Sequence, residues 1–151
     1  MREPYKTLIE GLIEALKRKY GDKFISLVVF GSVARGEARK DSDVDLLLVI
    51  DSVPKRRLER QREFMEVEKE LEGYLNELFD EGYFIDFSPI IKTPEEAMKF
   101  SPLYLDMVED AIIAYDKDDF FKKILERIRK RLEELGSKRV RMGRKLSLIH
   151  I

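Results

Sequence analysis

FGSVARGEARKDSDVDLLLVI, residues 30–50, connects the end of one apolar segment to the whole of the next. The preceding run, Phe24–Phe30, is short, apolar and rich in β-branched residues, which is typical of a buried strand. Gly31 and Ser32 end that run, and DVDLLLVI (residues 43–50) forms a second apolar run. The stretch therefore predicts two buried strands joined by a glycine–serine turn, one helical turn and a loop.

Apolar residues at helical spacing flank these two strands along the chain. They predict a first helix between Pro4 and Gly21, a long helix over Leu58–Phe79 and a last helix over Phe120–Leu135 that stops at Gly136. Two shorter helices are expected to open at cap-then-proline pairs, Thr93–Pro94 and Ser101–Pro102.

Two further apolar runs, Tyr83–Ile91 and Ala111–Asp116, predict a third and a fourth strand. The order of elements then predicts an α/β (α+β) domain with one mixed sheet of about four strands flanked by helices. We expect that domain to span residues 1–136 and a basic tail to span residues 137–151.

The composition restricts the class of protein. With 151 residues and 44% hydrophobic content, the chain is long and apolar enough for one folded domain. It contains no cysteine, which excludes disulfides and thiolate metal sites. No apolar run is long enough for a membrane span and the N-terminus is unlike a secretory signal, so we expect the cytoplasm. A charged content of 39% with only two amides, Gln61 and Asn76, is the pattern reported for thermophile proteins.

Charge is unevenly distributed along the chain. The net charge is −1, but basic residues outnumber acidic ones by 11 to 3 between Lys122 and Lys145. This excess indicates either a basic contact surface or a solvated helix followed by a loose tail. The segment SKRVRMGRK (residues 137–145) has no interleaved aromatic residues, so it does not indicate base stacking, and a nucleic-acid partner is not favoured.

Asp43 and Asp45 stand at the start of the second strand. Residues i and i+2 of a strand face the same side, so the two carboxylates should project together. Two like charges this close need a counter-charge, which a divalent cation that prefers oxygen ligands, Mg²⁺ or Mn²⁺, would supply. The alternative is a strand start with one carboxylate hydrogen-bonded to the backbone, and for the aspartate pair alone this alternative is favoured.

The Gly31–Ser32 turn upstream of the aspartates shifts the interpretation of the aspartate pair towards a metal site. Glycine at position 31 would allow close approach of a ligand to the backbone, and the following helix start offers unpaired N–H groups to an anion. Ser32 adds a hydroxyl donor. An anion site beside a cation site is what a nucleoside triphosphate with Mg²⁺ requires.

Asp86 interrupts the third apolar run. If the third strand lies beside the second, Asp86 would complete a cluster of three acids, which can hold two metal ions about 4 Å apart for an in-line displacement. The alternative is an aspartate on an edge strand that faces solvent or pairs with a lysine or arginine.

These residues resemble a known family, the minimal nucleotidyltransferases of the DNA polymerase β superfamily. The shared pattern is Gly-Ser, ten residues, then Asp-x-Asp, and it is carried by Gly31, Ser32, Arg35, Gly36, Ser42, Asp43, Asp45 and Leu46. The resemblance implies a palm-like mixed sheet flanked by helices. It also implies transfer of AMP from ATP, or of another nucleotide from its triphosphate, to a hydroxyl group with release of pyrophosphate.

The resemblance also implies roles for individual residues. Asp43 and Asp45 would bind two Mg²⁺ ions, with Mn²⁺ as an alternative metal, and Gly31 and Ser32 would hold the triphosphate. Asp86, matched by strand context alone, would bind the catalytic metal and help to deprotonate the acceptor hydroxyl. Arg35 (the fifth residue of the motif from Gly31) could reach a phosphate, or it could pair with an acid and brace the turn.

Small members of this family often serve as the antitoxin of a two-protein system, whose partner is a helical HEPN-class toxin. The resemblance therefore implies a protein adenylyltransferase that attaches AMP to that partner. Two alternatives stay open: an antitoxin that neutralises by contact alone, with a vestigial site, and a nucleotidyltransferase that modifies a small molecule such as an antibiotic.

Overall fold

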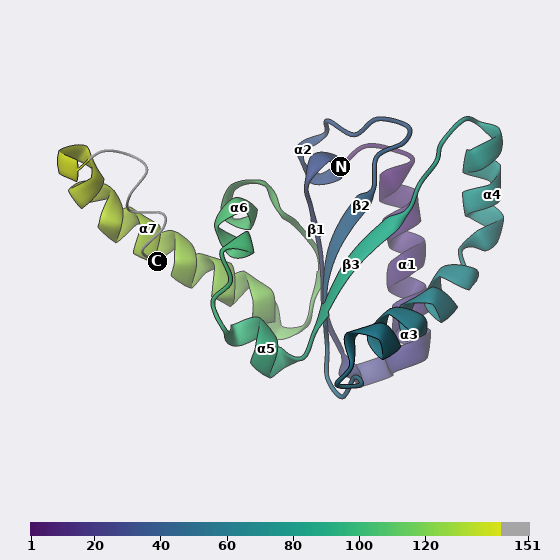
Figure 1. Cartoon of the computed structure of the whole chain (residues 1–151), viewed down its shortest axis with the longest axis horizontal. Helices are drawn as coiled ribbons and strands as arrows, with labels where there is room; N and C mark the ends of the chain where they lie inside the picture. The colour runs from purple at the N-terminus through teal and green to yellow at the C-terminus, as the bar shows by residue number, and fades with distance from the viewer. Residues whose placement is uncertain (143–151) are drawn as a thin grey trace.

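The computed structural model describes residues 1–142. In this part of the chain, a four-stranded sheet carries helices on both of its faces (Figure 1). The elements run α1 (Tyr5–Tyr20), η1 (Gly21–Lys23), β1 (Phe24–Phe30), α2 (Ser32–Arg35), β2 (Val44–Ile50), α3 (Arg57–Lys69), α4 (Glu72–Asp80), β3 (Phe87–Lys92), α5 (Pro94–Met98), α6 (Leu103–Asp110), β4 (Ile112–Asp116), η2 (Lys117–Asp119) and α7 (Phe120–Met142).

The strand order is β3-β2-β1-β4. β1 pairs antiparallel with both β2 and β4, whereas β2 pairs parallel with β3. The predicted mixed sheet flanked by helices is therefore confirmed. The start of β2 lies between the end of β1 and the start of β3, since Asp45 is in register with Phe30 on one side and Ser88 on the other.

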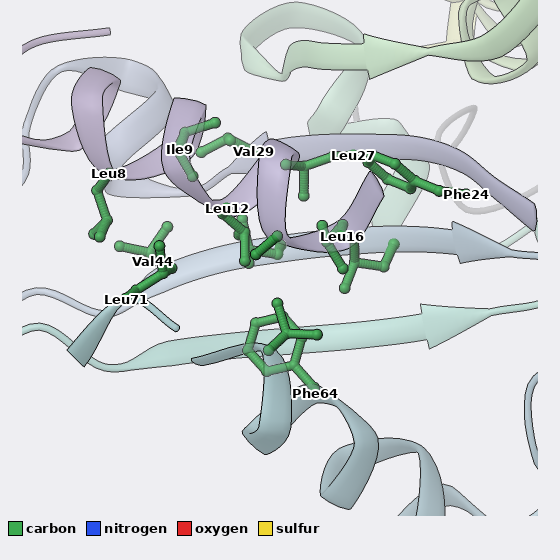
Figure 2. Packing of buried hydrophobic residues seen from close by; sticks show 14 of the residues in the cluster. Leu8, Ile9, Leu12, Leu16, Phe24, Leu27, Val29, Val44, Phe64 and Leu71 are labelled. Atoms are coloured by element: carbon green, nitrogen blue, oxygen red, sulfur yellow. The ribbon is translucent and has the colours of Figure 1, made fainter. Parts of the chain in front are cut away.

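Alternation along β2 divides the core into two clusters. Val44, Leu46 and Leu48 pack with α1 and α3 on one face, where Figure 2 shows the side chains of α1 against the strands. Leu47 and Val49 pack on the opposite face, with residues of α5, α6 and α7. Because burying one such side chain stabilises the fold by roughly 1.5–3 kcal/mol, the register of β2 is strongly fixed.

The prediction of one long helix over Leu58–Phe79 is wrong. The chain forms two helices there, α3 and α4, with Glu70 and Leu71 between them. Leu71 is buried against α1, where a Cβ added to Gly11 would lie 3.1 Å from its side chain. The bend lets this leucine reach the core, and tertiary packing therefore overrides the continuous helical pattern.

The third strand is shorter than predicted. It covers Phe87–Lys92 in place of Tyr83–Ile91. β2 begins only at Val44, so the residues before Phe87 have no neighbouring strand to pair with. They contact the loop before β2 instead, where the Phe84 N–H donates to the Lys40 carbonyl at 2.7 Å.

The last helix does not stop at Gly136, because α7 continues to Met142. One glycine costs only about 1 kcal/mol in a helix interior, and the helix-forming residues around it outweigh that cost. Residues 143–151 of the predicted basic tail lie outside the described residues, and the division at residue 136 stays a prediction. No helix within residues 1–142 is long and apolar enough to cross a membrane.

The outer edge of β3 is capped by side chains of α3. The Gln61 Nε2 donates to the carbonyl of Pro89 at 3.0 Å, and the Arg60 Nη1 donates to the carbonyl of Ile91 at 2.9 Å. Pro89 also lacks an N–H, so it offers no donor to a further strand.

Arg60 is the charged residue at the centre of this edge, and only 9% of it is exposed. Its Nη1 and Nη2 donate to the two carboxylate oxygens of Glu96 at 2.7 and 3.3 Å. Glu96 also accepts the Thr93 N–H in a capping box at the start of α5. The hydrogen bond from Arg60, followed by that from the Thr93 backbone, lowers the pKa of Glu96 to about 2.

We expect Glu96→Gln to lower the free energy of unfolding by about 1 kcal/mol at pH 7, since 43% of the Glu96 side chain is exposed and water screens the pair. Because the folded-state pKa lies below the ordinary value of 4.5, the contribution is complete above pH 4.5 and is lost as pH falls towards 2. In urea unfolding, the difference in the free energy of unfolding between wild type and Glu96→Gln should shrink as the pH is lowered from 7 to 2.5. Glu95→Gln, an exposed neighbour, should match wild type throughout; a gap that ignores pH would contradict this assignment.

Candidate active site

Asp43 and Asp45 lie where β2 begins, at the end of the sheet next to α2 (Figure 1). Asp45 is the second residue of β2 and is half-buried, whereas Asp43 precedes the strand and is exposed. Asp45 has the same strand parity as Leu47, which packs on the α5–α7 face, so its side chain belongs to that face.

Gly31 lies directly against the Asp45 carboxylate. Its backbone has φ +76° and ψ −155°, a conformation that side-chain-bearing residues rarely adopt. A Cβ added there would approach the Asp45 Oδ2 far closer than the 3.0 Å that Cβ atoms essentially never breach. Two separate reasons therefore require glycine at position 31: the backbone conformation, and the Asp45 carboxylate that occupies the place of a Cβ.

The electrostatics of this pair indicate a shortage of positive charge. Burial, and after it the negative charge of Asp43, raise the pKa of Asp45, and the Arg35 guanidinium only partly offsets them. A bound cation would relieve both the like-charge repulsion and the cost of burial. Two carboxylates at one strand start are oxygen donors of the kind that Mg²⁺ takes, so this pair fits a divalent metal.

Ser32 and Arg35 are the first and last residues of α2. The Ser32 hydroxyl has no hydrogen-bond partner among residues 1–136, and Ser32 follows Gly31 at the helix start. The Arg35 Nε donates to the Glu37 carboxylate at 2.6 Å, in an exposed ion pair. Of the two roles predicted for Arg35, this geometry favours pairing with an acid, while its charge also acts on Asp45.

Asp86 is not gathered with the other two aspartates in this structure. β3 does lie beside β2, and the Asp86 carbonyl accepts the Val44 N–H at 2.8 Å, so the two backbones are adjacent. Its side chain is exposed, however, and its charge acts on Glu68 of α3. Within residues 1–142 no group of three metal-ligating side chains forms. Asp86 precedes β3, so strand alternation does not set the direction of its side chain.

Glu68 is a neighbour of the site that the sequence interpretation missed. It is half-buried, and burial, followed by the charge of Asp86, raises its pKa. The sequence signal was its position beside Val67, in the apolar stripe of α3, where an acid is unexpected.

The segments that lead into β2 and β3 are tied to each other. The Lys40 Nζ donates to the Glu81 carbonyl at 3.3 Å and lies 5.0 Å from the centre of the Tyr83 ring. The Tyr5 hydroxyl donates to the carbonyl of Arg39 at 2.8 Å. The Lys40 contacts join the loop before Asp43 to the segment that carries Asp86, and the Tyr5 hydrogen bond joins the same loop to α1.

This arrangement is that of a nucleotidyltransferase, and comparison with known families agrees. The chain belongs to the nucleotidyltransferase domain family, whose sequence profile matches residues 9–100. The resemblance carried by the Gly-Ser and Asp-x-Asp pattern is thereby confirmed, as is the predicted class of enzyme.

Individual relatives narrow the comparison. MJ1305 of Methanocaldococcus jannaschii, whose assignment as a protein adenylyltransferase is provisional, is 36% identical over 81% of this chain and 79% of its own length. The protein adenylyltransferase MntA of Thermococcus cleftensis is 38% identical over 44% of this chain and 65% of its own. A toxin–antitoxin crystal structure with AMP-PNP contains a chain of the same fold, with a TM-score of 0.51, 16% identity, and coverage of 88% and 93%.

We expect Gly31→Ala to destabilise the fold by roughly 1–3 kcal/mol, because alanine must adopt a glycine-only conformation and its methyl group collides with the Asp45 carboxylate. Gly73→Ala is the matched control: no atom lies within 4 Å of its added Cβ and it sits within α4, so the helix should gain up to about 1 kcal/mol. Urea unfolding measures both changes. An unaffected Gly31→Ala variant would contradict the described contact.

Proposed function

We propose that this nucleotidyltransferase moves AMP from ATP to a hydroxyl group of a partner protein of the HEPN class, and so acts as an antitoxin. The observation that carries the proposal is the contact of the Asp45 carboxylate with Gly31, beside Asp43 and the free hydroxyl of Ser32. It supports the proposal because Asp43 and Asp45 would hold a cation next to a helix start that would bind an anion, as a metal–triphosphate substrate demands.

In the proposed step, the acceptor hydroxyl oxygen attacks the α-phosphorus of ATP. The bond from oxygen to the α-phosphorus forms, the bond to the β-phosphate oxygen breaks, and pyrophosphate leaves. The hydroxyl proton passes to a carboxylate base and then to water. Gly31 and Ser32 would hold the triphosphate, Gly31 because it lacks a side chain and Ser32 through its hydroxyl and the N–H groups at the start of α2.

Asp43 and Asp45 would hold Mg²⁺, or Mn²⁺ in its place, as two ions with Asp86 as the further ligand. Bound there, the metal would neutralise the triphosphate and stabilise the charge that develops on the leaving oxygen. The raised pKa of Asp45 supports this assignment, because Arg35 compensates only in part for the burial of its carboxylate and the like charge of Asp43.

Asp86 is the proposed base for the acceptor hydroxyl. Support comes from the hydrogen bond of its carbonyl with the Val44 N–H, which holds its backbone beside Val44, the residue that follows Asp43. Its exposed side chain forms no hydrogen bond or ion pair with the side chains of residues 1–136, so nothing described there holds it away from the aspartate pair.

A protein acceptor is favoured by the relatives, two of which carry the name protein adenylyltransferase. The structurally similar chain with AMP-PNP comes from a toxin–antitoxin complex, which supports a partner protein as well as a nucleotide.

With [α-³²P]ATP, Mg²⁺ and a purified HEPN-class partner, we expect label on the partner and release of pyrophosphate. Asp43→Asn and Asp45→Asn should lower the rate at least 100-fold, because removal of a carboxylate removes a metal ligand. EDTA should stop the reaction.

Asp41→Asn, which changes an exposed aspartate of the same loop, should keep wild-type activity. Label that persists without Asp43 or Asp45 would contradict the proposed site. A partner that is neutralised by these variants and never labelled would establish neutralisation by contact alone.

We expect Asp86→Asn to lower kcat by about 100-fold and to leave the KM for ATP within about twofold, since general-base catalysis contributes 10²–10⁴-fold. Glu68→Gln is the control, because Glu68 is the acid on which Asp86 acts in the described structure. If Glu68→Gln loses activity while Asp86→Asn retains it, the base is misassigned.

A further inference from the structure

A cleft of about 650 Å³ opens at the β3 edge of the molecule, between the start of α3 and the end of α5. The fold does not fill it, and the roles proposed for Asp43, Asp45 and Asp86 do not use it. Its walls combine basic side chains with two exposed apolar ones, Ile90 and Phe100.

Three basic side chains of this cleft have no acidic counterpart among residues 1–136: Lys55, Arg57 and Lys99 form no ion pair there. Lys92 has no acid partner there either, but its Nζ lies 5.4 Å from the centre of the Tyr104 ring. The one acid in the lining, Glu96, is already engaged by the buried Arg60. The cleft therefore attracts a negatively charged ligand. Arg60 lines the cleft, and its hydrogen bonds to Ile91 and Glu96 hold its side chain in place.

The cleft continues the face that carries the aspartate pair. Asp45 is in register with Ser88, and Leu47 is in register with Ile90, so all four residues share the α5–α7 face of the sheet. Ser88 and Ile90 are both exposed. Two residues of strand span about 7 Å, so the cleft begins at Ile90, about 7 Å along β3 from the residue in register with Asp45, and extends from there towards Lys92.

An occupant of the cleft would be recognised through its side chains. An extended peptide that joined the sheet would need the outward-facing groups of β3, but the carbonyls of Pro89 and Ile91 are already taken by α3. Only one aromatic residue, Phe100, lines the cleft, whereas surfaces that stack single-stranded nucleic acid place successive aromatics along the strand. A protein segment fits this wall better than RNA.

We propose that the cleft docks an acidic, partly apolar segment of the protein acceptor, which places the acceptor hydroxyl over Asp43 and Asp45. The inference rests on the proposed transfer of AMP to a protein and adds the surface that selects the acceptor. Lys55, Arg57 and Lys99 meet acidic side chains, and Ile90 and Phe100 meet apolar ones.

The test is the triple variant Lys55→Gln, Arg57→Gln, Lys99→Gln, assayed with [α-³²P]ATP and the HEPN-class partner as acceptor. All three residues are exposed and form no ion pair within the described chain, so the fold should be retained. We expect the KM for the acceptor to rise about tenfold and the KM for ATP to stay within twofold, because docking charges act on the partner alone. Added NaCl should raise the wild-type KM for the acceptor and shrink the difference.

The matched control is Lys122→Gln, Lys123→Gln, Arg127→Gln, which removes two lysines and one arginine from the exposed face of α7. It should keep both KM values. An unchanged KM for the acceptor, or a KM for ATP that rises equally, would overturn the docking role. Competition by a U12 RNA in wild type that the cleft variant abolishes would make the cleft an RNA site instead. Absence of transfer by wild type would refute the proposed function itself, which separates the two failures.

Discussion

The approach of the Asp45 carboxylate to the backbone of Gly31 is the constraint on which the site depends. It is held by the register between β1 and β2, which places Phe30 opposite Asp45. That register is in turn fixed by Val44, because its side chain must enter the core on the α1 side. A slip of one residue would turn the aspartates into this core and the apolar residues out of it. The alternation of apolar side chains along β2 thus determines on which face of the sheet the Asp45 carboxylate lies.

A feature of the fold or of the candidate site could be predicted from the sequence where neighbouring residues determine it, and not where contacts between distant segments do. The glycine–serine turn and the two aspartates follow from a few adjacent residues, and the two strands they connect follow from short apolar runs. The bend at Leu71 could not be predicted, because it goes with the packing of this side chain against α1, which is far away in the sequence. The position of the Asp86 side chain escaped prediction because Asp86 precedes β3, where strand alternation does not apply, and its charge acts on Glu68 of α3.

Positive charge is in short supply at the start of β2 and in excess in the cleft at the β3 edge. At Asp45 the protein supplies too little positive charge, while at Lys55 and Lys99 it supplies positive charge without an acid to meet it. A ligand that brings cations to one end and carboxylates to the other would satisfy both. Such a distribution favours one orientation of the bound molecule over its reverse, so the field contributes to specificity as well as to the rate of encounter.

The capped edge of β3 has a consequence for the behaviour of the protein in solution. Exposed strand edges are templates on which unrelated chains add and aggregates grow. Here the side chains of Gln61 and Arg60 already donate hydrogen bonds to the carbonyls with which an added strand would pair. Pro89 has no N–H to donate to such a strand. Substitution of these three residues would free the backbone groups of the β3 edge for pairing with other chains. The protein would then precipitate at high concentration.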